Sequence, residues 1–180
     1  MAVDIPRETL PLRIGNTQFS ITGTPCEHLP GGEVVGFIIA APSFGTTAGK
    51  PNAIYFSGDT IYLPELAKMR EKFRTQLSHP PFSCCVTRLT LTVNPCKDIS
   101  VALLNLGRAT APLPSGPLQI TMDGAQGARL FREIGAEVLV PMHFGSFKHF
   151  LEPRDEMERA LESEGDKVVW LKPGVKTKLA

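Results

Sequence analysis

The sequence carries almost no excess charge of either sign. Its 19 lysine and arginine residues nearly balance its 18 aspartate and glutamate residues, which leaves a formal net charge of +1 over 180 residues. Proteins that bind nucleic acid or anionic membrane surfaces by electrostatics are usually strongly basic. The balance therefore excludes both classes as the default interpretation, and we expect no nucleic-acid partner.

Long apolar runs are also missing. The longest, VVGFIIAAP at 34–42, has the length of a strand and falls far short of the ~20 residues that a membrane-spanning helix needs. The first residues, MAVDIPRETL, contain Asp4, Pro6 and Glu8 and lack the apolar stretch of a signal peptide. We therefore expect no transmembrane segment and no targeting signal.

Cysteine is scarce and unevenly placed. The four cysteines are Cys26, Cys84, Cys85 and Cys96. No pair of them has the CxxC spacing of common zinc and redox motifs. A zinc site made of His79 with Cys84, Cys85 and Cys96 would match no closed structural-zinc pattern. This usage favours a reduced setting, and we expect a cytoplasmic protein.

Apolar residues and turn-forming residues are plentiful. Hydrophobic residues make up 42% of the sequence and charged residues 21%, which is typical of a globular chain with enough material for a core. The 16 glycines and 16 prolines predict many turns. A length of 180 residues fits a single domain over 1–180.

Apolar periodicity predicts six strands and three helices. The strands are expected over 17–23, 33–40, 53–57, 100–106, 137–141 and 167–171. The helices are expected over 63–73, from a cap at Thr121 to Gly135, and from Pro153 to Gly165. A proline-rich loop with Pro112, Pro114 and Pro117 is expected before the second helix. Three strands followed by alternating helices and strands indicate an α/β sandwich.

Residues 74–98 do not fit this pattern. The segment has no clear period and separates a helix from the strand that should follow it, where connections are usually short. It also holds three of the four cysteines and a single acidic residue. We interpret it as an anomalous, disordered insertion, either a retained intron or a gene-model error, or else as a real loop of this protein.

Three metal-ligand types stand at the ends of predicted strands. His28 follows the first strand, Asp59 ends the third in YFSGDT, and His143 follows the strand EVLVP. Ligands of open α/β sheets bind at the carboxyl ends of the strands, and imidazole and carboxylate suit zinc, iron or manganese. Each residue also has a simpler interpretation, because Gly-Asp after a strand is commonly a turn and a lone histidine beside proline is commonly a surface or core residue.

Several stretches together resemble the metallo-β-lactamase superfamily. They are SITGTPCEHLPGGEVVGFII, IYFSGDT, VALLNLG, TMDGAQGARLFREIGAEVLVPMHF and FKHFLEP. The likeness is to the branch of ascorbate-6-phosphate lactonase-like and N-acyl-phosphatidylethanolamine phospholipase D-like hydrolases. It covers roughly 17–73 and 99–175, and the motifs occur in the family's order.

The resemblance implies a metal-dependent hydrolase of an ester, lactone, amide or phosphodiester. It implies that His28 and His143 each bind one of two metal ions and that the carboxylate of Asp59 bridges them. The ions would be zinc, with manganese or iron as alternatives. His149, in FKHF, matches a histidine near the substrate, so Asp59 and His149 are the expected catalytic residues. The expected partner is a small-molecule substrate.

The family's HxHxDH motif does not occur in this sequence. The chain therefore resembles the C-terminal half of an αββα sandwich, and each metal would keep only about two protein ligands, whereas a catalytic zinc ion normally has three. We expect weak metal binding, little hydrolysis by this chain alone, and a possible homo-oligomer in which a second copy covers the exposed sheet. The alternative is a non-catalytic remnant or binding protein that has lost the metal centre.

Overall fold

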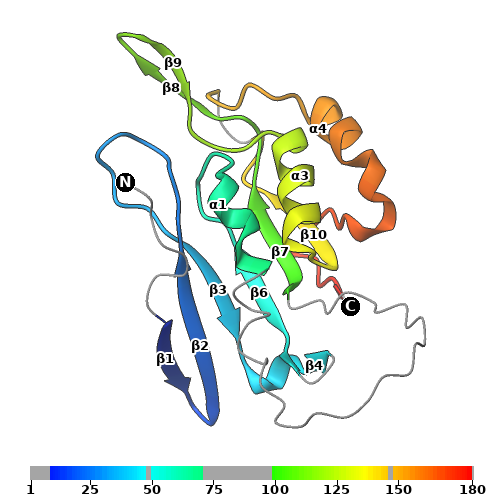
Figure 1. Cartoon of the computed structure of the whole chain (residues 1–180). Helices are drawn as coiled ribbons and strands as arrows, with labels where there is room; N and C mark the ends of the chain where they lie inside the picture. The colour runs from blue at the N-terminus through cyan, green and yellow to red at the C-terminus, as the bar shows by residue number, and fades with distance from the viewer. Residues whose placement is uncertain (1–8, 48–49, 71–98, 146–147, 180) are drawn as a thin grey trace, which may run out of the picture.

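The computed structural model describes residues 9–47, 50–70, 99–145 and 148–179 of the chain. Its centre is a six-stranded sheet in the order β1-β2-β3-β6-β7-β10 (Figure 1). These strands are β1 (Thr9–Ile14), β2 (Thr17–Thr24), β3 (Gly36–Ala40), β6 (Ala53–Phe56), β7 (Ile99–Asn105) and β10 (Val138–Met142). Strands β1, β2, β3 and β6 are antiparallel, whereas β6, β7 and β10 are parallel. The carboxyl ends of these last three strands therefore meet at one edge of the sheet.

The helices lie over the parallel half of the sheet. In Figure 1, α1 (Pro64–Ala67) and α3 (Gly124–Ile134) lie in front of β6, β7 and β10, and α4 (Arg154–Leu161) packs beside α3. Gly127 allows the close approach of α3 to the sheet, because a Cβ at this position would lie 2.7 Å from Leu106 Cδ2. The smaller elements are η1 (Pro42–Phe44), β4 (Thr46–Thr47), β5 (Lys50–Pro51), β8 (Thr110–Leu113), β9 (Gly116–Gln119) and η2 (Glu162–Lys167).

The sheet face under α1 and α3 holds the core. Tyr55, Ala102 and Leu139 are neighbours across β6, β7 and β10, and all three are buried. They belong to one hydrophobic cluster that also contains Leu66 of α1 and Phe131 of α3. Burial of each large apolar side chain stabilises the fold by about 1.5–3 kcal/mol, so this cluster holds the helices on the parallel strands.

The opposite sheet face is also apolar across all six strands, and we call it the second apolar face. By the strand registers it consists of Leu10, Leu12, Ile14, Phe19, Ile21, Phe37, Ile39, Ile54, Phe56, Val101, Leu103, Val138, Val140 and Met142. Its β1 members are open to solvent, with Leu10, Leu12 and Ile14 exposed by 56%, 42% and 61%. On β6 and β7, Ile54 and Val101 line a hollow together with Leu179.

The predicted strands are confirmed where they are continuous and apolar. The strands expected over 17–23, 53–57, 100–106 and 137–141 correspond to β2, β6, β7 and β10 within one or two residues. The strand expected over 33–40 begins only at Gly36, where a Cβ would lie 2.6 Å from the carbonyl oxygen of Ser57. The helix expected over 63–73 is present as α1 followed by a further helical turn up to Arg70, and its remainder lies outside the described residues.

Four predictions at element ends were wrong. The loop with Pro112, Pro114 and Pro117 is the hairpin β8–β9, in which Pro112 and Pro117 lie on strands that pair only with each other and Pro114 lies in the turn. The cap of α3 is Asp123 rather than Thr121, whose hydroxyl instead accepts a hydrogen bond from the Ala109 amide. The third helix ends at Leu161 and continues only as the 3-10 segment η2. In place of a strand over 167–171 there is a single bridge between Leu139 and Val168.

Strand β1 was missed by the sequence-based prediction. Leu10, Leu12 and Ile14 alternate with polar residues or proline, which is a strand signal, and Gly15 and Asn16 form the two-residue turn to β2. Pro11 hides this signal, yet proline is tolerated in an edge strand such as β1. In the described part of the chain, no helix is long and apolar enough to cross a membrane. The predicted insertion at 74–98 lies outside the described residues.

Candidate functional site

Three polar side chains meet where the parallel strands end. Asp59 follows β6, Asn105 is the last residue of β7, and His143 follows β10. Asp59 Oδ1 lies 3.2 Å from His143 Nδ1 and accepts a 2.7 Å hydrogen bond from Asn105 Nδ2. The structure therefore brings together two of the three predicted ligand residues and joins them to a third group.

The backbone turns sharply on both sides of this contact. Gly58, immediately before Asp59, has φ +63°, and a Cβ there would lie 3.0 Å from the carbonyl oxygen of Val35. His143 adopts φ +56°, a left-handed conformation that is uncommon for a residue with a Cβ. Such strain concentrates at functional sites, where it directs a side chain that the strand geometry alone would not place.

Asp59 and His143 remain partly open to solvent, whereas Asn105 is buried. The side chain of Asp59 is exposed by 32% and that of His143 by 38%, whereas Asn105 is exposed by only 6%. Asn105 Oδ1 is buried and has no hydrogen-bond partner among the described residues. The sequence analysis missed Asn105, although a polar residue inside the apolar run SVALLNL was a visible signal.

His28 lies on the loop that follows β2, next to the loop that carries Asp59. The two loops are joined by two hydrogen bonds, because Ile61 N donates to Glu27 O and Glu27 N donates to the side-chain Oγ1 of Thr60. His28 Nδ1 lies 2.7 Å from the carbonyl oxygen of Ile120. A carbonyl can only accept, so Nδ1 carries the hydrogen and the neutral ring keeps its lone pair on Nε2.

A cavity of about 360 Å³ adjoins His28. It is lined by the loop after β2, including Cys26 and Glu27, by Ile61, and by Leu118 and Gln119 of β9. Cys26 Sγ donates a hydrogen bond to the carbonyl oxygen of Ser57, which ties this wall to the end of β6. The hairpin β8–β9 thus contributes one wall of the space beside a predicted ligand.

His149 lies in the same aromatic group as His143 but is not in contact with Asp59. Its ring is 4.6 Å from the ring of Phe150, which packs edge-on against His143 at 5.1 Å. Gly107 makes room for Phe150, since a Cβ at this glycine would lie 3.0 Å from Phe150 Cδ1. His149 is exposed and is linked to His143 through the ring of Phe150.

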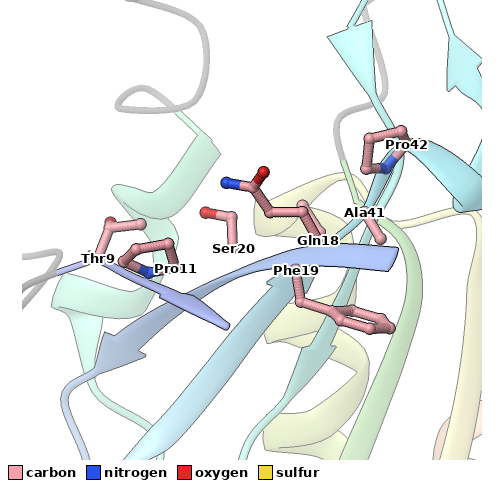
Figure 2. Close-up of a pocket in the computed structure, with 8 residues that line it drawn as sticks. Thr9, Pro11, Gln18, Phe19, Ser20, Ala41 and Pro42 are labelled. Carbon is pink, nitrogen blue, oxygen red and sulfur yellow. The ribbon is translucent and has the colours of Figure 1, made fainter. Parts of the chain in front are cut away.

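A second hollow lies on the hairpin β1–β2 and has a different character. Figure 2 shows Thr9, Pro11 and Ser20 pointing to one side of the hairpin, while Phe19 points to the other. The hollow measures about 330 Å³ and extends to Ala41 at the end of β3. None of its lining residues is a histidine, a cysteine or an acidic residue.

The donors at the strand ends fit a metal ion in kind but not in number. Asp59 offers Oδ2, which has no hydrogen-bond partner among the described residues, and His28 offers Nε2. Imidazole and carboxylate are ligands that zinc accepts. Within the described ranges, however, no three His, Cys, Asp or Glu side chains lie close enough to hold one ion together.

Three solved structures with a similar fold carry the description of a hydrolase. The chain matches Igni18, a metallo hydrolase from the hyperthermophilic archaeon Ignicoccus hospitalis, at 24% identity and a TM-score of 0.54 over 91% of this chain and 57% of that chain. It matches an isothiocyanate hydrolase from Delia radicum gut bacteria at 18% identity and a TM-score of 0.57, over 92% and 56% of the two chains. A third match is a possible metal-dependent hydrolase from Veillonella parvula, at 15% identity and a TM-score of 0.57, over 92% and 55%.

The chain has the metallo-β-lactamase fold. The fold predicted from the motifs is therefore confirmed, as a mixed sheet with few helices. The chain spans slightly more than half the length of these three hydrolases. No family model and no curated protein sequence matches it.

Proposed function

We propose that this chain supplies part of the metal site of a hydrolase that cleaves an ester, lactone, amide or phosphodiester. Asp59, His143 and His28 are the proposed ligands, and His149 is the proposed substrate-side residue. The observation that carries this proposal is the 3.2 Å contact between Asp59 Oδ1 and His143 Nδ1 at the carboxyl ends of two parallel strands. The metallo-hydrolases that share the fold support it.

The chain's own residues have definite tasks in this proposal. Asn105 and His143 both engage Oδ1 of Asp59, so the carboxylate is held in one orientation with Oδ2 available. The bond from His28 Nδ1 to Ile120 O orients the imidazole and directs Nε2 away from this carbonyl, which is the usual arrangement of a metal-binding histidine. A bound zinc ion, or manganese or iron, would supply Lewis acidity and lower the pKa of water at the site.

The proposal also includes impaired activity. The family places two metal ions at such a site, and the described residues bring only Asp59 and His143 into contact. A metal ion with two protein ligands binds weakly compared with the three ligands of a catalytic zinc site. We therefore propose weak binding and slow hydrolysis for this chain unless further ligands join it.

The alternative is a non-catalytic remnant or binding protein. It is favoured by one observation, which is that the described residues contain no group of three metal-binding side chains. In this alternative the contact between Asp59 and His143 is an ordinary polar contact that ties the ends of β6 and β10 together.

Zinc titration of the purified chain tests the two functions. We expect weak binding by the unaltered chain, measured by competition with a chromophoric chelator, and a loss of about tenfold or more in affinity for Asp59→Asn and His143→Ala. His79→Ala is the control and should bind zinc as the unaltered chain does. Equal zinc affinity in all four proteins would reject the metal site and favour the remnant.

Metal content and activity test the impairment. After dialysis, elemental analysis should find well under two zinc ions per chain, and hydrolysis of ester, lactone, amide and phosphodiester substrates should be slow and should disappear in His143→Ala. Retention of two zinc ions per chain would show that the proposed impairment is wrong.

A further inference from the structure

Asn105 combines two features that are seldom found together in a buried side chain. Its Nδ2 donates a 2.7 Å hydrogen bond to Asp59 Oδ1, and Asn105 as a whole is only 6% exposed. Its Oδ1 is buried as well, yet it has no hydrogen-bond partner among the described residues. Buried polar atoms without a partner are rare, because they lose hydration and gain nothing in return.

Turning the amide over would not repair this defect. The carbonyl oxygen of Asn105 would then face the carboxylate of Asp59, and two acceptors would oppose each other. The two N–H donors would occupy the place where one acceptor is now unpaired. The contact with Asp59 therefore fixes the orientation of the amide and accounts for the unpaired oxygen.

The surroundings of Asn105 favour an apolar residue. By register Asn105 lies beside Met142 of β10 and follows Val101 and Leu103 on the same face of β7. An aliphatic side chain at this position would continue the second apolar face and would leave no polar atom unpaired. The stability of the fold therefore does not explain why an asparagine stands here.

We propose that Asn105 is a positioning residue that orients Asp59 for cation binding and that it lowers the stability of the fold by doing so. The inference rests on the proposed function, in which Asp59 is a metal ligand. Because Asn105 Nδ2 and His143 Nδ1 both engage Oδ1, the carboxylate cannot rotate freely and Oδ2 stays in one place. Sequences that break a local packing rule do so most often at functional sites.

The variant Asn105→Leu separates the two effects. It removes the donor to Asp59 and the unpaired oxygen together, so zinc affinity and stability should move in opposite directions. We expect zinc to bind about tenfold more weakly, as for other partners of metal ligands, while the urea midpoint of unfolding stays equal or rises. Asn105→Ala provides the zinc measurement if the leucine variant does not fold.

Asn52 is the matched control. It is a half-buried asparagine directly before β6. Its Nδ2 donates a 3.0 Å hydrogen bond to the carbonyl oxygen of Phe44, the last residue of η1. Asn52→Leu should lower the urea midpoint and leave zinc affinity unchanged. If Asn105→Leu behaves like this control, Asn105 is a structural residue and the inference is overturned.

Asp59→Asn keeps this test distinct from the test of the proposed function. If Asp59→Asn weakens zinc binding and Asn105→Leu does not, the metal site stands and the positioning role of Asn105 is overturned. If Asp59→Asn leaves zinc affinity unchanged, the proposed function fails, and a double-mutant cycle in urea then tests the contact itself. Non-additive unfolding free energies for positions 59 and 105 would support the positioning of Asp59 by Asn105, and additive ones would overturn it.

Discussion

At the scale of single residues, Glu152 is a buried carboxyl group outside the candidate site. It is 6% exposed, and both of its carboxylate oxygens accept from the Gly124 amide at the start of α3, at 2.8 and 3.0 Å. Burial raises the pKa of this carboxyl, and the neighbouring Asp123 and Glu156 raise it further, whereas the Gly124 amide and Arg108 act in the opposite direction. Glu152 thus connects α3 to the segment before α4.

This raised pKa predicts a pH-dependent stability. A carboxyl group whose pKa is higher in the folded than in the unfolded chain stabilises the fold fully below the unfolded pKa, which is about 4.3 for glutamate, and loses this contribution as pH rises through the folded pKa. Glu152→Gln keeps an acceptor for Gly124 and cannot ionise. We therefore expect the unfolding free energy of Glu152→Gln, relative to the unaltered chain, to increase from pH 4 to pH 7.

Urea denaturation at pH 4, 5.5 and 7 measures this difference. Glu162→Gln is the control, because Glu162 is exposed at the end of α4 and its replacement should follow the unaltered chain at every pH. Parallel curves for Glu152→Gln and the unaltered chain would show that ionisation of Glu152 does not affect folding.

At the scale of elements, α3 has a well-defined beginning. Asp123 accepts a 2.8 Å bond from the Gln126 amide, and the Gln126 side chain accepts from the Asp123 amide at 3.2 Å, which is a capping box. Replacement of such a cap by alanine costs about 1 kcal/mol. We expect Asp123→Ala to lower the unfolding free energy by about this amount in urea titration, whereas the exposed Asp166→Ala should change it little. An unchanged value for Asp123→Ala would mean that the α3 end is held by Glu152 alone.

The elements that the sequence predicted well are those with one dominant signal. Strands β6, β7 and β10 are short apolar runs, and their burial on the sheet agrees with that pattern. The prediction failed where prolines contradicted the periodicity, in β1 and in the hairpin β8–β9, because a proline disfavours central strands but not strands with an open edge. The last strand failed because KVVWL is apolar enough for a strand, yet only Val168 pairs with the sheet.

The candidate site was predictable only where the positions of its residues follow from the strands. Asp59 and His143 could be placed together because parallel strands end at the same edge, and the structure puts them in contact. The distance of His28 from them depends on the eleven-residue stretch between β2 and β3, whose path no periodic pattern determines. Asn105 was hidden because its role depends on the carboxylate of a neighbouring strand and not on its own sequence context.

At the scale of the whole molecule, the sheet has one face under helices and a second face that is apolar on every strand. On β1 this second apolar face is open, with Leu12 and Ile14 exposed by 42% and 61%. No charged side chain lies on it at the registered positions of the six strands. Contiguous apolar surfaces of this kind favour association, and two copies of an uncharged face can meet without repulsion between like charges.

We therefore expect the chain to form homo-oligomers through the second apolar face. The molar mass from light scattering should rise with concentration, and Leu12→Lys with Ile14→Lys should reduce this association by placing two positive charges on each copy. Gln18→Lys is the matched control, since Gln18 is exposed on β2 and by register faces the opposite side from Phe19. It adds a charge to the same hairpin and should leave association unchanged. A constant monomer mass at all concentrations would show that the face is not used between copies, whereas equal loss of association in all lysine variants would assign it to charge alone.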